Sequence, residues 1–537
     1  ESTVRALHER APAEIRQALR PFGYYRPGIR SELLERRSGW LARYHVDPGE
    51  PVRYAGVELT LTGEGADDRL LRGVLQRAGV EEGTVLRHAV WERAKETLLN
   101  QATSRGYLDV RVTRSRVEVD TTALTARAVL AVETGPRYRF GEVRFPETPF
   151  AQPLLDRYVT FTPGDWFDLD ALLTMQRSLT SSDYFRLVQV DPRRDDADSL
   201  RVPVRVSLEP QSPSSYTIGA GYGTDTGIRG TAAWRRRWIN AAGHRVQAEL
   251  RGSPRIQSVT GQYVIPIGGG PAHRVVATTV FIREAFEELE SRSSFVRLEL
   301  DHSRLGWREV ASIRLAEEWS KFVVDRVVDA DTVRAMETSS RTLLIPEIVW
   351  SRVWGDDALY PRAGYRVQLD VSGATRKLLS DLSFGQTLLR LSAVRGLHPT
   401  GRVLVRLNAG ATIVDDFAAL PVSLRLFAGG DQSVRGFAYR SIGPVGQDSS
   451  AIGGRHRVVG SVELEQMVIG PVGVAAFTDA GNVFATGGDV SLSGLEQGVG
   501  FGLRWRSPIG LVRADIAWPV TRPQDDPRLH FVVGRVL

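Results

Sequence analysis

The 537-residue sequence contains no cysteine, has few lysines and lacks any long hydrophobic run. Without cysteine the chain can form neither a disulfide framework nor a thiolate site. Its uninterrupted apolar stretches, such as Val472–Phe477, are far shorter than the ~20 residues that a membrane-spanning helix needs. A helical membrane protein is therefore excluded. A membrane β-barrel is not excluded, because its alternating strands average to a soluble-looking hydropathy.

Positive charge is modest and comes almost entirely from arginine. The formal net charge is +6, and we find lysine only at Lys95, Lys321 and Lys377. A charge of this size over so long a chain is weak support for a nucleic-acid partner. The basic run at 235–237 is flanked by tryptophans, which favours an interfacial strand end over a nucleic-acid contact. We therefore predict no nucleic-acid partner.

The chain changes character near residue 210, at the turn-rich segment 209–215. Before this segment, helical and strand patterns alternate. After it we find no helical pattern, and alternating strands follow one another to the end. The length alone favours several domains, because a single core rarely serves so long a chain.

The first part repeats itself at intervals of roughly 80 residues. Each repeat is a helical stretch, an aromatic-centred turn and a strand. The turns are Gly23-Tyr24, Gly106-Tyr107 and Asp183-Tyr184. Glycine permits the left-handed residue that ends a helix, and the tyrosine packs on the following sheet. We predict three α/β modules, the first of them short at its start, over 1–50, 51–135 and 136–210.

The second part, 213–537, is a series of antiparallel strands with one apolar and one charged face. In segments 296–301 and 365–371, aliphatic residues alternate with charged ones. A soluble sandwich would bury the apolar face, whereas a membrane barrel turns it to lipid and keeps the charged face in a wet lumen. Dense charge of both signs and aromatic residues near strand ends favour the barrel. At ~20 residues per strand and turn, the region holds roughly sixteen strands.

A long glycine-rich segment interrupts these strands at residues 425–444 and contains Val434-Arg435-Gly436-Phe437. With its flanks, this segment resembles the outer-membrane assembly-factor superfamily, in which POTRA (polypeptide-transport-associated) modules precede a barrel of sixteen strands. The count of modules is most similar to the translocation and assembly module group, typified by TamA. BamA-type members have more modules, and two-partner secretion pores have fewer.

The resemblance implies that the segment around 425–445 folds back into the lumen, where acidic residues of the inner wall hold Arg435. The matching acidic positions are Glu463 and Asp479, and Phe477 belongs to the same strand motif as Asp479. The local alternation independently places Glu463 on the charged, inward face. We expect this contact to specify one loop position more than to add stability, because burying the ions costs desolvation.

A lateral seam is expected where the first strand of the barrel meets the last, which we place at 530–537. Glycine is frequent there and predicts poor side-chain packing. The seam residues that we predict are Gly219, Gly221, Gly223, Phe531, Val533 and Gly534. If the seam opens sideways, a client strand can pair with the exposed edge by β-augmentation.

The resemblance implies an outer-membrane translocation and assembly factor with its N-terminal modules in the periplasm. Its implied partners are outer-membrane lipid, a TamB-like inner-membrane-anchored protein, and unfolded outer-membrane β-protein clients such as autotransporters. A two-partner secretion transporter and a passive pore or adhesin stay open as alternatives. The lumen segment argues against the passive pore, which needs no plug.

The sequence shows no catalytic set. The spacing of Gly219, Gly221 and Gly223 looks like a dinucleotide loop, but no βαβ unit follows it. The nine histidines are scattered without metal-ligand spacing, and the acidic pairs at 356–357 and 415–416 fall in predicted loops. We therefore predict no enzyme, no cofactor and no metal site.

Overall fold

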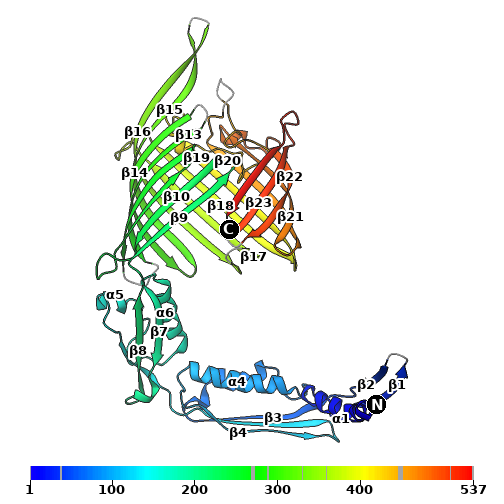
Figure 1. The fold of residues 1–537 in the computed structure, drawn as a ribbon. Coiled ribbons are helices and arrows are strands. Elements are labelled where there is room, and N and C mark those ends of the chain that lie inside the picture. The colour runs from blue at the N-terminus through cyan, green and yellow to red at the C-terminus, as the bar shows by residue number, and fades with distance from the viewer. Residues whose placement is uncertain are drawn as a thin grey trace. The chain divides into compact units, whose positions relative to one another are not determined.

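The computed structural model describes residues 2–36, 39–225, 227–267, 273–286, 289–328, 331–357, 360–445, 451–507 and 510–534. The chain divides into two compact units, Glu1–Thr148 with Tyr158–Gln211 and Pro149–Arg157 with Ser212–Leu537. The first unit mixes helices and strands, and the second is a large antiparallel sheet (Figure 1). Within the described residues, no helix has both the length and the apolar character needed to cross a membrane.

Residues 51–135 form a three-stranded sheet with helices packed on it. The strands, in the order β3-β5-β4, are β3 (Arg53–Thr62), β5 (Thr125–Glu133) and β4 (Arg111–Asp120). The helices are α2 (Arg69–Arg72), α3 (Val74–Arg77) and α4 (His88–Ser104), with a 3-10 turn η2 (Glu64–Asp67). Trp91, Ala94, Leu98 and Ala102 form a buried stripe on α4 at helical spacing, and they share one core with Leu130 of β5.

Residues 136–210 repeat the same topology. The strands, in the order β6-β8-β7, are β6 (Arg139–Arg144), β8 (Arg201–Pro210) and β7 (Phe185–Pro192), and η3 (Arg194–Asp196) precedes β8. In both sheets the first strand runs parallel to the last, which pairs antiparallel with the middle one. Helix α6 (Leu169–Ser181) buries Leu172, Met175 and Leu179, and the Asp168 carboxylate caps its first turn.

The first segment has a different structure. It contains α1 (Ser2–Leu19), η1 (Arg20–Phe22) and the antiparallel hairpin of β1 (Gly28–Arg36) and β2 (Gly39–Asp47). Across the described residues the first unit therefore has two three-stranded sheets and one helix-hairpin segment, rather than three equivalent modules. The module boundaries 1–50, 51–135 and 136–210 stay a prediction.

The repeated turns adopt the left-handed backbone that the sequence predicts. The φ angles are 94° at Gly23, 94° at Gly106 and 64° at Asp183. A Cβ at Gly106 would lie 2.9 Å from the backbone oxygen of Phe167, so the second turn also needs the space that glycine leaves. Aspartate is one of the few other residues that tolerate this region, which accounts for the third turn.

The second unit is a sixteen-stranded antiparallel sheet that curls into a near-closed barrel, with each strand paired to its neighbours in sequence (Figure 1). The strands are β9 (Ser214–Gly223), β10 (Gly227–Arg236), β11 (Arg245–Gly252), β12 (Ile256–Pro266), β13 (Arg274–Phe286), β14 (Leu289–Arg304), β15 (Trp307–Val328), β16 (Asp331–Gly355), β17 (Ala363–Ala374), β18 (Phe384–His398), β19 (Gly401–Val414), β20 (His456–Ile469), β21 (Val472–Phe484), β22 (Glu496–Ser507), β23 (Gly510–Pro519) and β24 (Arg528–Gly534). Short elements of this unit are α5 (Gln152–Asp156), η4 (Val422–Leu424) and η5 (Gly487–Asp489). The predicted fold class, α+β POTRA modules followed by an all-β barrel of about sixteen strands, is confirmed. Residues 535–537, which we assigned to the last strand, lie outside the described residues.

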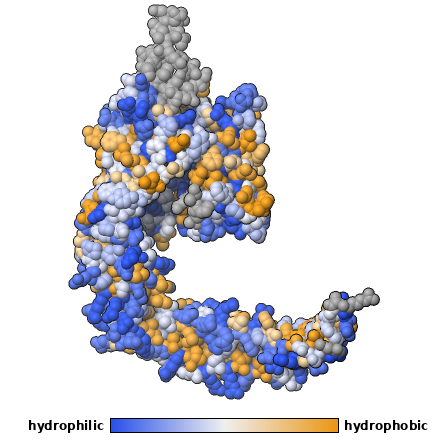
Figure 2. All heavy atoms as spheres, in the orientation of Figure 1, coloured by the Kyte–Doolittle hydropathy of each residue, from blue (hydrophilic) through white to orange (hydrophobic). Residues whose placement is uncertain are grey.

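The barrel strands carry an apolar outer face and a polar inner face. In β14, Val296, Leu298 and Leu300 are 60%, 52% and 47% exposed, whereas Asp301 is 3% exposed. Figure 2 shows hydrophobic side chains gathered over the outside of the strands. This is the alternation of a lipid-facing barrel with a charged lumen, as predicted.

Strands β9 and β24 are the two ends of the sheet. Among the described residues, no ladder of hydrogen bonds pairs β24 with β9. Side chains meet there instead. The rings of Tyr222 and Phe531 have centroids 6.3 Å apart, and the Phe531 backbone N–H donates to Thr224 Oγ1 at 3.3 Å. The seam is therefore bridged by side chains.

Candidate functional site

The segment 425–445, here called the lumen loop, packs against the inner face of the barrel. Val434, Phe437 and other apolar loop residues share a buried cluster with Val459 of β20 and Val483 of β21. Val434 is 0% exposed. Gly436 has φ 95°, and a Cβ there would lie 3.0 Å from the Pro519 backbone nitrogen. The loop thus has one tightly fitted position on the wall.

Arg435 is the polar centre of this position and is 1% exposed. Its Nε and Nη2 donate to the two oxygens of Asp479 at 2.7 and 2.9 Å, which is a bidentate pair. Its Nη1 donates to Glu463 at 2.8 Å and to Asp515 at 3.0 Å. The guanidinium carbon lies 3.3 Å from the centroid of the Phe477 ring. The structure thus brings together the predicted Arg435, Glu463, Asp479 and Phe477.

A second arginine holds the same carboxylates from the other side. Arg504 of β22 donates to Glu463 through Nη2 at 2.6 Å and to Glu465 through Nε at 3.0 Å. It also donates to Asp515, so Glu463 and Asp515 each accept from both arginines. Asp479 differs, because every hydrogen bond that its side chain accepts from described residues comes from Arg435. Without the Arg435 side chain, the buried Asp479 carboxylate would keep only the backbone N–H of residue 435 as a donor, at 3.0 Å, and would lose its charged partner.

Glycine leaves the room for this network. Gly498, Gly500 and Gly502 alternate along β22 and face, in turn, the Arg435 backbone, the Phe477 ring and Asp515. A Cβ at Gly498 would lie 2.0 Å from the Arg435 carbonyl oxygen, and one at Gly502 would lie 1.9 Å from Asp515 Oδ1. No larger residue fits at these positions without moving the loop or the carboxylate.

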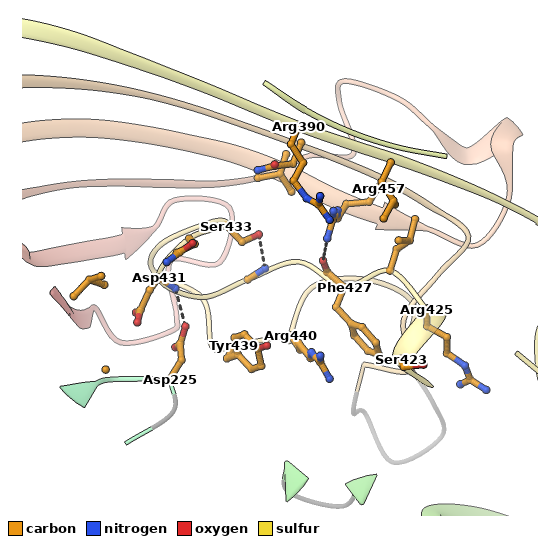
Figure 3. A pocket seen from close by; sticks show the side chains of 18 of the residues that line it. Asp225, Arg390, Ser423, Arg425, Phe427, Asp431, Ser433, Tyr439, Arg440 and Arg457 are labelled. Carbon is orange, nitrogen blue, oxygen red and sulfur yellow. Dashed lines mark hydrogen bonds between the residues drawn. The ribbon is translucent and has the colours of Figure 1, made fainter. Parts of the chain in front are cut away.

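The lumen loop also bridges the two edges of the seam, through what we call the seam cluster: Thr224, Asp225, Asp431 and His530. The Asp431 backbone N–H donates to Asp225 Oδ2 at 2.9 Å (Figure 3), and Thr224 Oγ1 donates to Asp431 Oδ1 at 2.9 Å. His530 of β24 contacts Asp431 Oδ1 through Nδ1 at 2.5 Å. His530 Nε2 accepts the Gly436 N–H at 3.0 Å, which places the proton of a neutral ring on Nδ1. One loop aspartate thus connects the end of β9 with β24.

One ligand atom from each of Asp225, Asp431 and His530 lies within 4.8 Å of the others, which is a grouping that could hold a cation. Both ring nitrogens and both carboxylates are already in hydrogen bonds, however. The grouping is accounted for as a hydrogen-bonded clasp, and we assign no metal to it.

The predicted seam residues lie along the two edge strands, apart from the arginine network. Gly219 and Gly223 of β9 pair with Thr231 and Gly227 of β10. Gly221 faces the Arg229 side chain, and a Cβ there would lie 2.9 Å from its Nε. On β24, the partners of Phe531, Val533 and Gly534 on β23 are Ala514, Val512 and Leu511. The functional role of these residues stays a prediction.

Sequence reasoning missed the residues that complete the site. Arg504, Asp515 and Glu465 look like ordinary inward charges on alternating strands, and their convergence depends on strand register. The alternating glycines at 498–502 were an available signal for close approach. The seam cluster had no local signal, because its members are separated by up to about 300 residues, between Thr224 and His530.

A separate ionic contact joins segments 51–135 and 136–210 within the first unit. Asp109 accepts from Arg194 Nε and from the Tyr138 hydroxyl, both at 2.9 Å. Burial raises the pKa of Asp109, but the hydrogen bonds from Arg194 and Tyr138 outweigh this effect and leave the pKa below its ordinary value. The carboxylate is therefore held in its charged form at neutral pH.

Comparisons with known proteins point to one superfamily. Residues 290–535 match the Omp85 superfamily domain, and residues 1–48 match POTRA domain TamA domain 1. The outer membrane protein assembly factor BamA of Neorickettsia risticii is 22% identical over 541 residues, which cover 96% of this chain and 69% of that protein. BamA of Nitratidesulfovibrio vulgaris is 23% identical over 397 residues, which cover 71% of this chain and 48% of that protein.

Solved structures agree on the fold. The crystal structure of BamA from Haemophilus ducreyi lacking POTRA domains 1–3 has a TM-score of 0.70 at 18% identity and covers 90% of this chain and 100% of that one. CdiB from Escherichia coli has a TM-score of 0.50 at 13% identity and covers 99% of this chain and 97% of that one. The chain thus matches the Omp85 superfamily domain over residues 290–535, and its fold is that of the solved BamA structure. It lies in the outer membrane, with its N-terminal POTRA domains in the periplasm.

Proposed function

Because this chain carries an Omp85 superfamily domain in the outer membrane, we propose that it is a translocation and assembly factor. It inserts or exports β-rich clients, such as autotransporters, through the seam between β9 and β24. The observation that carries this proposal is the seam itself, where a loop and side chains, rather than a strand ladder, join the edges among the described residues.

The physical basis is the cost of an unpaired backbone in lipid. Each unsatisfied amide or carbonyl in hydrocarbon costs several kcal/mol, so a free strand edge is a strong template for an incoming strand. Client strands that pair one after another keep the backbone hydrogen-bonded throughout, and no external fuel is required. Separation of β9 from β24 would break side-chain contacts such as Tyr222 with Phe531, which cost less than a full ladder.

In this proposal the lumen loop holds the seam. The Arg435 network fixes the loop to β20, β21 and β23, and the same loop carries Asp431 into the seam cluster. If the lumen loop leaves the wall, Asp431 therefore loses its contacts to the end of β9 and to β24 at the same time. A passive pore does not require a loop that a buried ion-pair network holds in the lumen. Steady high conductance of the protein across a planar bilayer would favour the passive pore instead.

We further propose that the N-terminal modules dock a TamB-like inner-membrane-anchored protein. The match of residues 1–48 to a TamA POTRA domain supports this proposal. The fragment 1–209 should capture the periplasmic part of such a protein in a pull-down, and the chain without 1–209 should not. If the chain without 1–209 still captures the TamB-like protein, the docking site lies on the barrel.

The assembly role is tested with purified full-length protein in liposomes and an unfolded autotransporter barrel as client. Heat-modifiable migration on gels and protease protection report client folding. The expected result is faster folding than in empty liposomes or in liposomes that hold an unrelated closed barrel. Equal rates in all three would reject the proposal, and surface release of an unfolded client would favour two-partner secretion instead.

A further inference from the structure

A cavity of about 670 Å³ lies inside the barrel between the lumen loop and the wall strands (Figure 3). Its charged lining is unbalanced. The charged lining residues are six arginines (Arg229, Arg390, Arg425, Arg440, Arg457 and Arg513) and two aspartates (Asp225 and Asp431). Such an excess of guanidinium along the lining of a cavity attracts an anion.

The two aspartates do not neutralise these arginines by direct contact. Asp225 accepts the Asp431 backbone N–H, and Asp431 is held by Thr224 and His530. Both carboxylates are therefore engaged in the seam cluster. Among the described residues, neither has an ion pair with an arginine of the cavity lining.

Arg513 is a buried lining arginine without a carboxylate in hydrogen-bonding contact. It is 8% exposed, and its Nε is buried with no hydrogen-bond partner. Across the described residues, Arg513 forms no ion pair within 4.0 Å, although Glu463 and Asp515 lie in its electrostatic surroundings. A buried guanidinium Nε without a bonded partner carries a desolvation penalty. A ligand that supplies acceptor oxygens would remove this penalty.

Two further arginines face the same space. Arg457 donates to the Phe427 carbonyl oxygen at 3.3 Å, but its Nε is buried without a partner. Figure 3 shows Arg390 beside Arg457, with the two guanidinium groups close together. Arg390 has one carboxylate partner, Asp370, at 2.7 Å. The repulsion between two neighbouring guanidinium groups is relieved by an anion that both can contact.

We infer that this cavity is a binding site for a phosphate group. Arg390, Arg457 and Arg513 come from β18, β20 and β23, so their donors approach from different strands. A tetrahedral phosphate has acceptor oxygens in several directions, whereas a carboxylate has two in one plane, and guanidinium pairs with phosphate through parallel N–H donors. The volume is in the range of small-ligand pockets and accommodates a headgroup-sized ligand.

The phosphate can be a free anion or the headgroup of a lipid. Tyr222, Phe531 and Val533 also line the cavity, so it reaches the seam, where the barrel wall has no ladder among the described residues. A lipid headgroup would have a route from the membrane through this edge. This inference does not depend on the proposed assembly role, because binding is measured without a client.

The test is calorimetric titration of the full-length protein in a nonionic detergent and a phosphate-free buffer. Three probes are used: inorganic phosphate, the water-soluble dihexanoyl phosphatidic acid, and an acidic peptide without phosphate. We expect phosphate and the lipid to bind, with the lipid tighter if the headgroup is the natural source and equal affinities if a free anion is. Peptide binding without binding of either phosphate probe would overturn the inference.

Arg513→Gln should weaken binding of the phosphate probes about tenfold or more, which is the effect of losing a charge-assisted bond. The matched control is Arg308→Gln, which removes the same charge from a wall arginine that is paired with Asp301 and does not line the cavity. It should bind as wild type does. Equal weakening in both variants, or none in Arg513→Gln, would contradict the site. If Arg513→Gln does not fold, Arg457→Gln gives the same readout.

Discussion

Replacement of Arg435 by alanine should release the lumen loop far more than it weakens the barrel. The change removes the side-chain contacts to Asp479, Glu463 and Asp515. Glu463 and Asp515 keep Arg504 as a partner, but Asp479, which is 0% exposed, loses its guanidinium contacts. Loss of one partner of a buried ion pair costs about 3–5 kcal/mol. The barrel ladder is untouched, so this cost falls on the loop position.

The size of the effect follows from this free energy. Since every ~1.4 kcal/mol is a factor of ten, the population of released loop should rise between roughly a hundredfold and several thousandfold. Arg435→Lys keeps the charge but loses the bidentate geometry, and we expect an intermediate value. Adding Asp479→Ala to Arg435→Ala should recover part of the cost, because the buried carboxylate without a charged partner is then absent.

Thiol labelling measures this release without background, because the chain has no cysteine. A cysteine in place of Val434, which is 0% exposed, reacts with a maleimide only when the loop leaves the wall. The labelling rate should increase by the factors above in Arg435→Ala. Arg308→Ala, a change at a wall ion pair outside the loop, should leave the rate unchanged. A wild-type labelling rate in Arg435→Ala would refute the role assigned to the network.

Three further outcomes are expected. Gly498→Ala places a Cβ 2.0 Å from the Arg435 carbonyl oxygen and should speed the same labelling, whereas Gly252→Ala, with open space around it, should not. His530→Phe removes both ring contacts of the seam cluster and should speed amide exchange in β24 roughly tenfold. Asp109→Asn should speed exchange in η3. In wild type, Asp109 protects the η3 amides against exchange. This protection is present above the ordinary carboxyl pKa of 3.8 and is lost as the pH falls through the lowered pKa of Asp109.

Each of these outcomes has a clear contrary result. Equal labelling in both glycine variants would show that the tight approach at β22 does not position the loop. Unchanged exchange in β24 after the histidine change would remove the seam cluster as a clasp. If protection of the η3 amides does not fall as the pH is lowered from 7 to well below 3.8, Asp109 does not hold the contact between the two segments.

The sequence predicted the barrel because alternation is a local property. Val296, Leu298 and Leu300 point outward for the reason that the pattern indicates, and the number of strands follows from length. The repeated turns could also be predicted from the sequence, since Gly23 and Gly106 mark left-handed positions. The first segment could not be predicted in this way, because the same helix-turn signal precedes a hairpin there instead of a three-stranded sheet.

Only part of the site could be predicted from the sequence. A motif identified Arg435 and two of its acidic partners, but Arg504 and Asp515 meet them because four adjacent strands, β20 to β23, hold one register. Register across several strands is not a local property of sequence. The same holds for Asp431 and His530, which meet because a long loop returns through the lumen to the seam.

The most direct test of the account is a reversible lock across the seam. Cysteines replace Tyr222 and Phe531, whose rings lie 6.3 Å apart, and a short cleavable thiol cross-linker joins β9 to β24 in an otherwise cysteine-free chain. Client folding in liposomes is then measured before and after cleavage, with both single-cysteine variants as controls. The joined protein should fold clients no faster than empty liposomes do, and cleavage should restore the rate. Full activity of the joined protein would contradict this expectation.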